Sequence, residues 1–133
     1  MDLEWVATEP DTRRLSHGAR RSTVEDYEAR IEALRALGEG YSEVSRADRA
    51  YPHVAMSFRR PYAVVHQWPN ENEIFLLAGD SVIDDHDVVL LPGLESDTPF
   101  SGAFVLSADH AWDLVKSFIR SGSVDDLGEW YVL

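Results

Sequence analysis

The spacing of apolar residues changes twice along this chain, and this change constrains the fold more than any other feature of the sequence. Over residues 22–37 the apolar side chains recur every three or four positions, which is the period of an amphipathic helix. Over residues 53–78 they alternate with other residues or form short runs, as in β-strands. Helical spacing returns over residues 107–120. This order predicts an α+β fold in which two amphipathic helices pack on an antiparallel sheet of about five to six strands.

Both predicted helices carry signals for their first and last residues. A hydroxyl side chain, Ser22 or Thr23, is placed to cap the first helix, and Gly38 follows its last turn. Ser107 is placed to cap the second helix, and Gly122 follows it. A hydroxyl cap accepts a hydrogen bond from a free backbone amide, and glycine readily adopts the left-handed conformation that ends a helix.

The strands are predicted from short apolar or alternating runs that stop at turn residues. These runs cover Leu3–Ala7, His53–Phe58, Tyr62–Trp68, Glu73–Ala78, Val88–Leu91, Gly102–Leu106 and Glu129–Leu133, with the weakest signals in Leu3–Ala7 and Gly102–Leu106. Tyr62–Trp68 is apolar on both faces and should be a central strand, paired as a hairpin with the run that follows it. We expect loops at Glu9–Arg21 and Leu94–Ser101.

The length of 133 residues and the hydrophobic content of 44% are typical of one globular domain covering residues 1–133. We expect three aromatic side chains, Trp112, Phe118 and Trp130, to pack between the second helix and the sheet. The lack of cysteine excludes disulfides, thiolate zinc sites, iron–sulfur clusters and cysteine nucleophiles. No apolar run approaches the roughly 18 to 20 residues of a membrane span, and no basic leader precedes an apolar stretch. We therefore expect a cytoplasmic protein.

The charge of the chain is strongly acidic and unevenly distributed. Asp and Glu number 24 against 12 Lys and Arg, and residues 61–133 contain 13 acidic side chains but only two basic ones. Such a surface repels the phosphates of nucleic acids and of anionic lipids, so we expect direct binding neither to nucleic acid nor to membranes. It attracts a basic protein partner. The alternative is that the acidity serves solubility alone.

Residues that carry chemistry form no recognisable catalytic arrangement. The five histidines have no metal-binding spacing, and His66, on an apolar strand, is expected to be half-buried and hydrogen-bonded. The run Asp84–Asp87 holds three carboxylates and His86, but neighbours on an extended segment point to opposite sides, which favours a solvated loop over a metal site. No nucleophile elbow or phosphate-binding glycine loop is present. We expect a binding protein without catalytic residues, metal or cofactor.

The carboxy-terminal stretch Ser107–Gly122, followed by Glu129-Trp130, resembles the end of the first-numbered family of bacterial polymorphic-toxin immunity proteins. In that family a polar cap opens an amphipathic helix, a small hydroxyl residue and a glycine end it, and a strand with a tryptophan finishes the chain. The matching positions here are Ala111, Phe118, Ser121, Gly122 and Trp130. One departure is that the family commonly places Arg-Pro shortly after the glycine, where this chain has Ser123-Val124-Asp125-Asp126.

The resemblance implies a role rather than a set of functional residues, because each member of such a family binds its own toxin. It implies a cytoplasmic protein that is made beside a secreted or contact-delivered toxin and protects the producer by occluding the toxin's carboxy-terminal active domain. Many such toxins act on nucleic acid through basic clefts, which an acidic surface can occupy. A small carboxylate and histidine metal-binding enzyme and an adaptor module remain the alternatives.

The acidic segment Asp80–Asp97 is the predicted toxin-binding surface, because it contains no basic residue and includes the apolar run Val88–Leu91. Affinity at protein interfaces concentrates in a few buried anchors, so two aromatic residues from the adjoining turns are added as candidates. Both aromatics have core packing as the competing interpretation. The complete set of candidates is Trp68, Asp80, Asp84, Asp85, Asp87, Glu95, Asp97 and Phe100.

Overall fold

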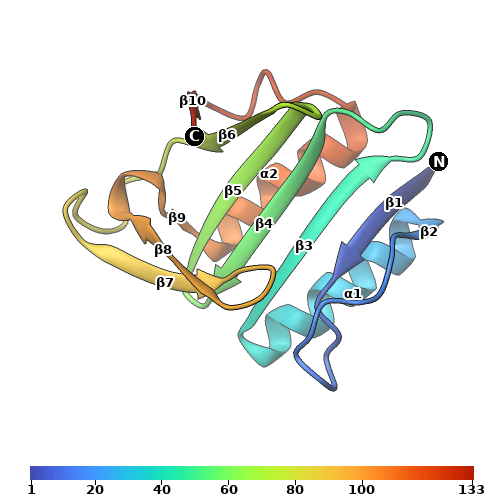
Figure 1. The fold of residues 1–133 in the computed structure, drawn as a ribbon, viewed down its shortest axis with the longest axis horizontal. Coiled ribbons are helices and arrows are strands. Elements are labelled where there is room, and N and C mark those ends of the chain that lie inside the picture. Colours follow the sequence, from blue (N-terminus) through green and yellow to red (C-terminus); the bar gives the residue numbers. More distant parts are fainter.

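The computed structural model describes all 133 residues, and Figure 1 shows their arrangement. The elements follow one another as β1 (Asp2–Ala7), β2 (Arg20–Thr23), α1 (Val24–Leu37), β3 (Glu39–Arg46), β4 (His53–Arg59), β5 (Tyr62–Asn70), β6 (Glu73–Leu77), β7 (Val88–Pro92), β8 (Asp97–Ser101), a 3-10 turn (Gly102–Phe104), β9 (Leu106–Ser107), α2 (Ala108–Ser121) and β10 (Trp130–Val132). Neither helix combines the length and the apolar character that a membrane crossing requires.

Eight strands form one sheet in the order β10-β6-β5-β4-β3-β1-β2, and the short β9 pairs with the beginning of β5. All of these pairs are antiparallel. The remaining strands, β7 and β8, pair only with each other. The α+β class is therefore confirmed, whereas the predicted number of five to six strands in the sheet is too small.

The strands that the sequence does not predict are β2, β3 and β8. The loop expected at Glu9–Arg21 gives way to β2 in its last two residues, and the loop expected at Leu94–Ser101 contains β8. Conversely, the run Gly102–Leu106 is not one strand, because a 3-10 turn occupies its first three residues and β9 starts only at its last. For β2, β3 and β8, pairing with a neighbouring strand, rather than apolar periodicity, determines the local structure.

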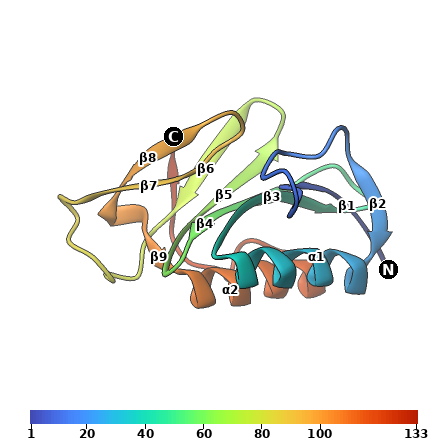
Figure 2. The ribbon, with the colours of Figure 1, turned by 90° about the horizontal axis from the view of Figure 1, so that it is seen from below.

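The helices begin and end where the capping signals predict. The Thr23 side chain accepts a hydrogen bond from the Asp26 amide at the start of α1, and the Ser107 side chain accepts one from the His110 amide at the start of α2. Gly38 ends α1 with a φ of 97°, in the left-handed region that glycine tolerates. Figure 2 shows that both helices lie on the same side of the sheet.

The main core fills the space between the two helices and the sheet. Tyr27 and Ile31 of α1 and Trp112 and Phe118 of α2 are buried there. Trp130 packs against this core in a partly buried position, where its indole N–H donates to the backbone oxygen of Val124 at 3.0 Å. The positions predicted for the aromatic residues of the carboxy-terminal part are confirmed.

A second, smaller apolar cluster lies on the opposite side of the sheet. Its buried members are Val64 of β5, Leu76 of β6, Leu91 of β7 and Val105. The cluster attaches β7 and β8 to the side of the sheet that carries no helix, which Figure 2 shows from the edge. We call residues 88–101, which include β7, β8 and the turn between them, the arm, and we call the helix-free side of the sheet the open face.

Candidate functional site

The open face is produced by the alternation of side chains along the central strands. On β4, Val54, Met56 and Phe58 point into the main core, so that the intervening Ser57 lies on the open face. The strand register places Ser57 opposite Tyr41 of β3 on one side and opposite a β5 residue on the other. A small side chain between larger neighbours leaves the middle of the open face hollow.

The arm is tied to the sheet by one arginine at the end of β4. The Arg59 guanidinium donates to the backbone oxygen of Leu90 at 2.9 Å and to both carboxylate oxygens of Asp97 at 3.0 and 3.1 Å. It also donates to Glu39 of β3 at 3.0 Å. The same arginine thus joins β7, β8 and the sheet, and the arm crosses the open face as a fixed element (Figure 1).

A groove of about 610 Å³ lies between the arm and the open face. Its floor includes Tyr41, Ser57, His66 and Trp68, and its other side comes from the arm and from Phe104. Half of the lining residues are hydrophobic. This size and composition are those of pockets that bind a small ligand or a single anchoring side chain.

Aromatic rings line this groove and continue beyond it along the open face. Trp68 stacks on His53 with ring centroids 4.5 Å apart, and Tyr51 follows at 5.6 Å from His53. In the other direction, His66 meets the edge of the Phe100 ring at 5.4 Å. Both aromatic candidates from the sequence, Trp68 and Phe100, are partly buried and line the groove. Phe100 also packs against the smaller apolar cluster, so core packing describes part of its role.

His66 occupies the middle of the groove floor and differs from its expected state. Its side chain is 8% exposed, and its Nδ1 atom is buried without a hydrogen-bond partner, whereas the sequence predicts a hydrogen-bonded, half-buried imidazole. Burial lowers the pKa of His66 to about 4. The imidazole is therefore uncharged at neutral pH.

The six acidic candidates do not form one continuous surface. Asp80 lies beside the start of α2, where its carboxylate accepts a hydrogen bond from the Ser107 amide at 3.1 Å and contacts the His110 ring at 3.0 Å. Asp97 is paired with Arg59, and these hydrogen bonds lower the pKa of Asp97 below its usual value. These two carboxylates already have partners within the chain.

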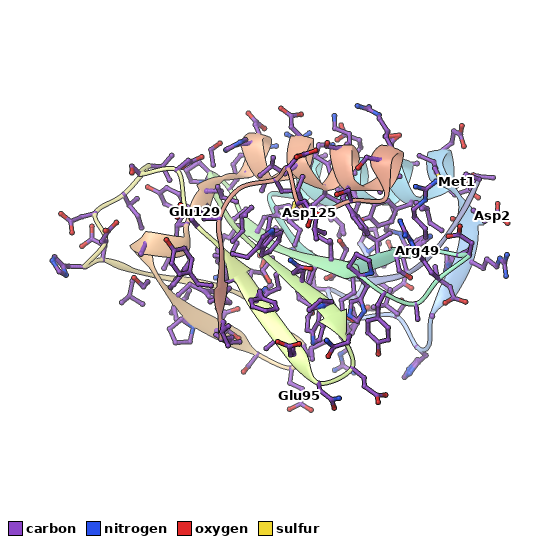
Figure 3. All side chains as sticks on the ribbon, turned by 90° about the horizontal axis from the view of Figure 1, so that it is seen from above. Met1, Asp2, Arg49, Glu95, Asp125 and Glu129 are labelled. Atoms are coloured by element: carbon purple, nitrogen blue, oxygen red, sulfur yellow. The ribbon has the colours of Figure 1, made fainter.

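The other four acidic candidates are exposed and border the arm. Asp84, Asp85 and Asp87 lie on the loop that leads into β7, where the only side-chain bond among them joins Asp84 to the His86 amide at 2.8 Å. Glu95 lies in the turn of the arm and lines the groove. Figure 3 shows Glu95 on the side of the molecule that faces away from the helices.

The outer surface of the arm carries apolar residues from the run Val88–Leu91 that are not among the candidate contact residues. Val88 and Leu90 of β7 have exposed fractions of 65% and 53%, and Leu94, in the turn of the arm where it also lines the groove, has 59%. Their neighbours in β7 point inward, and Leu91 is fully buried. Because side chains alternate along a strand, the four-residue apolar run of β7 had to place half of its members outward, and this signal was present in the sequence.

The described residues contain no group of three or more His, Cys, Asp or Glu side chains arranged to hold a metal ion. No model of a known protein family matches this chain, and no curated protein is significantly similar to it. The candidate site therefore rests on its own geometry: an arm with an exposed apolar ridge, four exposed carboxylates beside it and an aromatic groove beneath it.

Proposed function

We propose that this chain is an immunity protein that binds the carboxy-terminal domain of a cognate bacterial toxin in the cytoplasm of the producing cell. The arm and the carboxylates beside it cover the active site of the toxin, so that the toxin cannot reach its substrate. The protein itself catalyses no reaction. The resemblance of residues 107–122 and 129–130 to one family of toxin immunity proteins supports this proposal.

The observation that carries the proposal is the apolar ridge on the arm with its acidic border. Val88 and Leu90, the two outward side chains of β7 that form this ridge, are each more than half exposed, so that their apolar surface is available to a partner. An apolar centre with a polar rim is the usual arrangement of a protein-binding surface. The ridge and Glu95 lie on the arm, on the side of the sheet that no helix covers, and the three aspartates lie on the loop that leads into it.

The charge of this region points to the class of toxin. No lysine or arginine occurs between Pro61 and Lys116, a stretch that includes the whole arm and the loop before it. A toxin domain that cleaves or modifies nucleic acid needs a basic cleft to bind phosphates. An acidic arm is complementary to such a cleft and accelerates association with it.

Expression in a bacterial host tests the proposal most simply. The toxin domain encoded beside this chain is expressed from an inducible promoter, alone or together with this chain, and growth and co-purification are measured. We expect the toxin domain alone to stop growth, and the two proteins together to permit growth and to purify as a complex. A complex without protection would favour an adaptor. The absence of both a complex and protection would contradict the proposal.

A further inference from the structure

The groove beneath the arm has a chemistry that differs from that of the arm's outer surface. Four aromatic residues line it, namely Tyr41, Trp68, Phe100 and Phe104. The only carboxylate side chain in its lining is Glu95, at the turn of the arm, and no lysine or arginine lines it. The groove therefore offers aromatic faces and one negatively charged side chain.

The floor of the groove adds no positive charge. His66 is uncharged at neutral pH because burial lowers its pKa to about 4. The hydroxyl group of Tyr41 donates to Glu43 at 2.5 Å, so this donor is already engaged within the sheet. An anionic ligand such as a phosphate or a carboxylate would find no cation here and would be repelled by Glu95.

From these features we infer that the groove receives an arginine side chain of the toxin domain. The apolar stem of the arginine packs along Ile74 and Leu76, the guanidinium plane lies against the rings of Trp68 or Phe100, and Glu95 supplies the opposite charge. This inference rests on the proposed function, because a basic toxin cleft is the source of the arginine. Arginine fits better than lysine, since its planar group stacks on aromatic rings.

Small probes test the chemistry of the groove without the toxin. Propylguanidinium reproduces the arginine side chain, and propylurea has the same shape without the charge. Butylammonium reproduces the lysine side chain, and butyrate carries a negative charge. Each probe is titrated into the isotope-labelled protein, and binding is followed by NMR shifts of the Trp68 indole and of the amides around His66. We expect propylguanidinium to bind at least about threefold more tightly than propylurea or butylammonium, and butyrate not to bind.

Two substitutions connect the probe to the groove. Glu95→Gln should weaken binding of propylguanidinium about threefold, as expected for one partly solvated ion pair. Trp68→Leu should weaken it about fivefold through loss of the ring, while binding of propylurea changes little. Asp84→Asn is the matched control, because it removes the same charge from an exposed site outside the groove lining and should leave the affinity unchanged.

The inference would be overturned if propylurea shifted the groove signals as strongly as propylguanidinium, or if the shifts centred on the loop of Asp84–Asp87. It would also be overturned if Asp84→Asn weakened binding as much as Glu95→Gln. Unfolding curves of each variant show whether a lost signal reflects a lost fold. Because the probes need no toxin, a negative result with the probes overturns this inference alone, and the proposed function is tested separately by the toxin experiment.

Discussion

Trp112 and Phe118 are the aromatic side chains of α2 that depend most on burial, with exposed fractions of 3% and 1%. Replacing either one by alanine leaves a large cavity between α2 and the sheet, and we expect a loss of about 3 to 5 kcal/mol in the free energy of unfolding. Urea unfolding measures this loss. Leu37→Ala serves as the control, because that side chain is 43% exposed and its truncation should cost less than about 0.5 kcal/mol. Equal stabilities of all three variants would show that the core lies elsewhere.

His66 makes the stability depend on pH. In the unfolded chain its pKa is near the ordinary value of 6.5, whereas burial lowers the folded pKa to about 4. The folded state therefore binds fewer protons in this range, and stability is retained above pH 6.5 and lost as the pH falls towards 4. The full effect amounts to about 3 kcal/mol.

A substitution separates this effect from the titration of the carboxylates. His66→Gln removes the titrating imidazole, so the difference in unfolding free energy between wild type and variant should shift in favour of the variant as the pH falls from 7 to 4. Chemical unfolding at several pH values measures it. A difference that stays constant over this range would mean that His66 is accessible to water and protons in the folded protein.

At the scale of single elements, substitutions on the outward side of the arm should affect toxin binding without affecting stability, which depends on the inward side. Val88→Ser together with Leu90→Ser removes the apolar ridge but leaves the buried Leu91 in place. We expect the thermal stability to change little, and the affinity for the toxin domain to fall at least about tenfold. Leu37→Ser, on α1 at the opposite side of the sheet, is the control for removing exposed apolar area. If the double variant binds the toxin domain as tightly as the Leu37→Ser control does, the ridge is not part of the interface.

The helices could be predicted from the sequence because their signals are local. Thr23, Gly38, Ser107 and Gly122 act within one turn of the helix that they bound. The strand β3 has no such signal, since two of its buried residues are serines and its pairing with β1 and β4 comes from distant parts of the chain. Segments whose structure depends on distant partners cannot be identified from local periodicity.

Dependence on distant parts of the chain also explains which part of the candidate site could be predicted. The acidic segment was identified as a unit, but its carboxylates diverge in space: Asp80 turns to α2 and Asp97 to Arg59. Proximity in the sequence does not establish a common surface, because a hairpin and a loop send neighbouring residues in different directions. The sequence predicts no groove and supplies only two of its lining residues, Trp68 and Phe100, since the groove forms where the arm lies over the sheet.

At the scale of the whole molecule, the formal net charge of −12 should steer the association with a basic toxin domain. The loop variant, with Asp84→Lys, Asp85→Lys and Asp87→Lys, reverses the exposed charge beside the arm. It should remain folded, because these side chains have no ion pair within the chain. A control variant makes the same change of net charge at exposed positions elsewhere: Glu71→Lys, Asp125→Lys and Asp126→Lys.

The most direct measurement is the association rate constant of the purified toxin domain with the wild type, the loop variant and the control variant, at about 0.05 M and about 0.3 M salt. We predict that the loop variant associates at least about tenfold more slowly than the control variant at low salt, and that high salt slows the wild type and narrows this gap. Cells that express the toxin should lose protection with the loop variant only. Equal association rates and equal protection for the two variants would contradict a toxin-binding role for the acidic side of the arm.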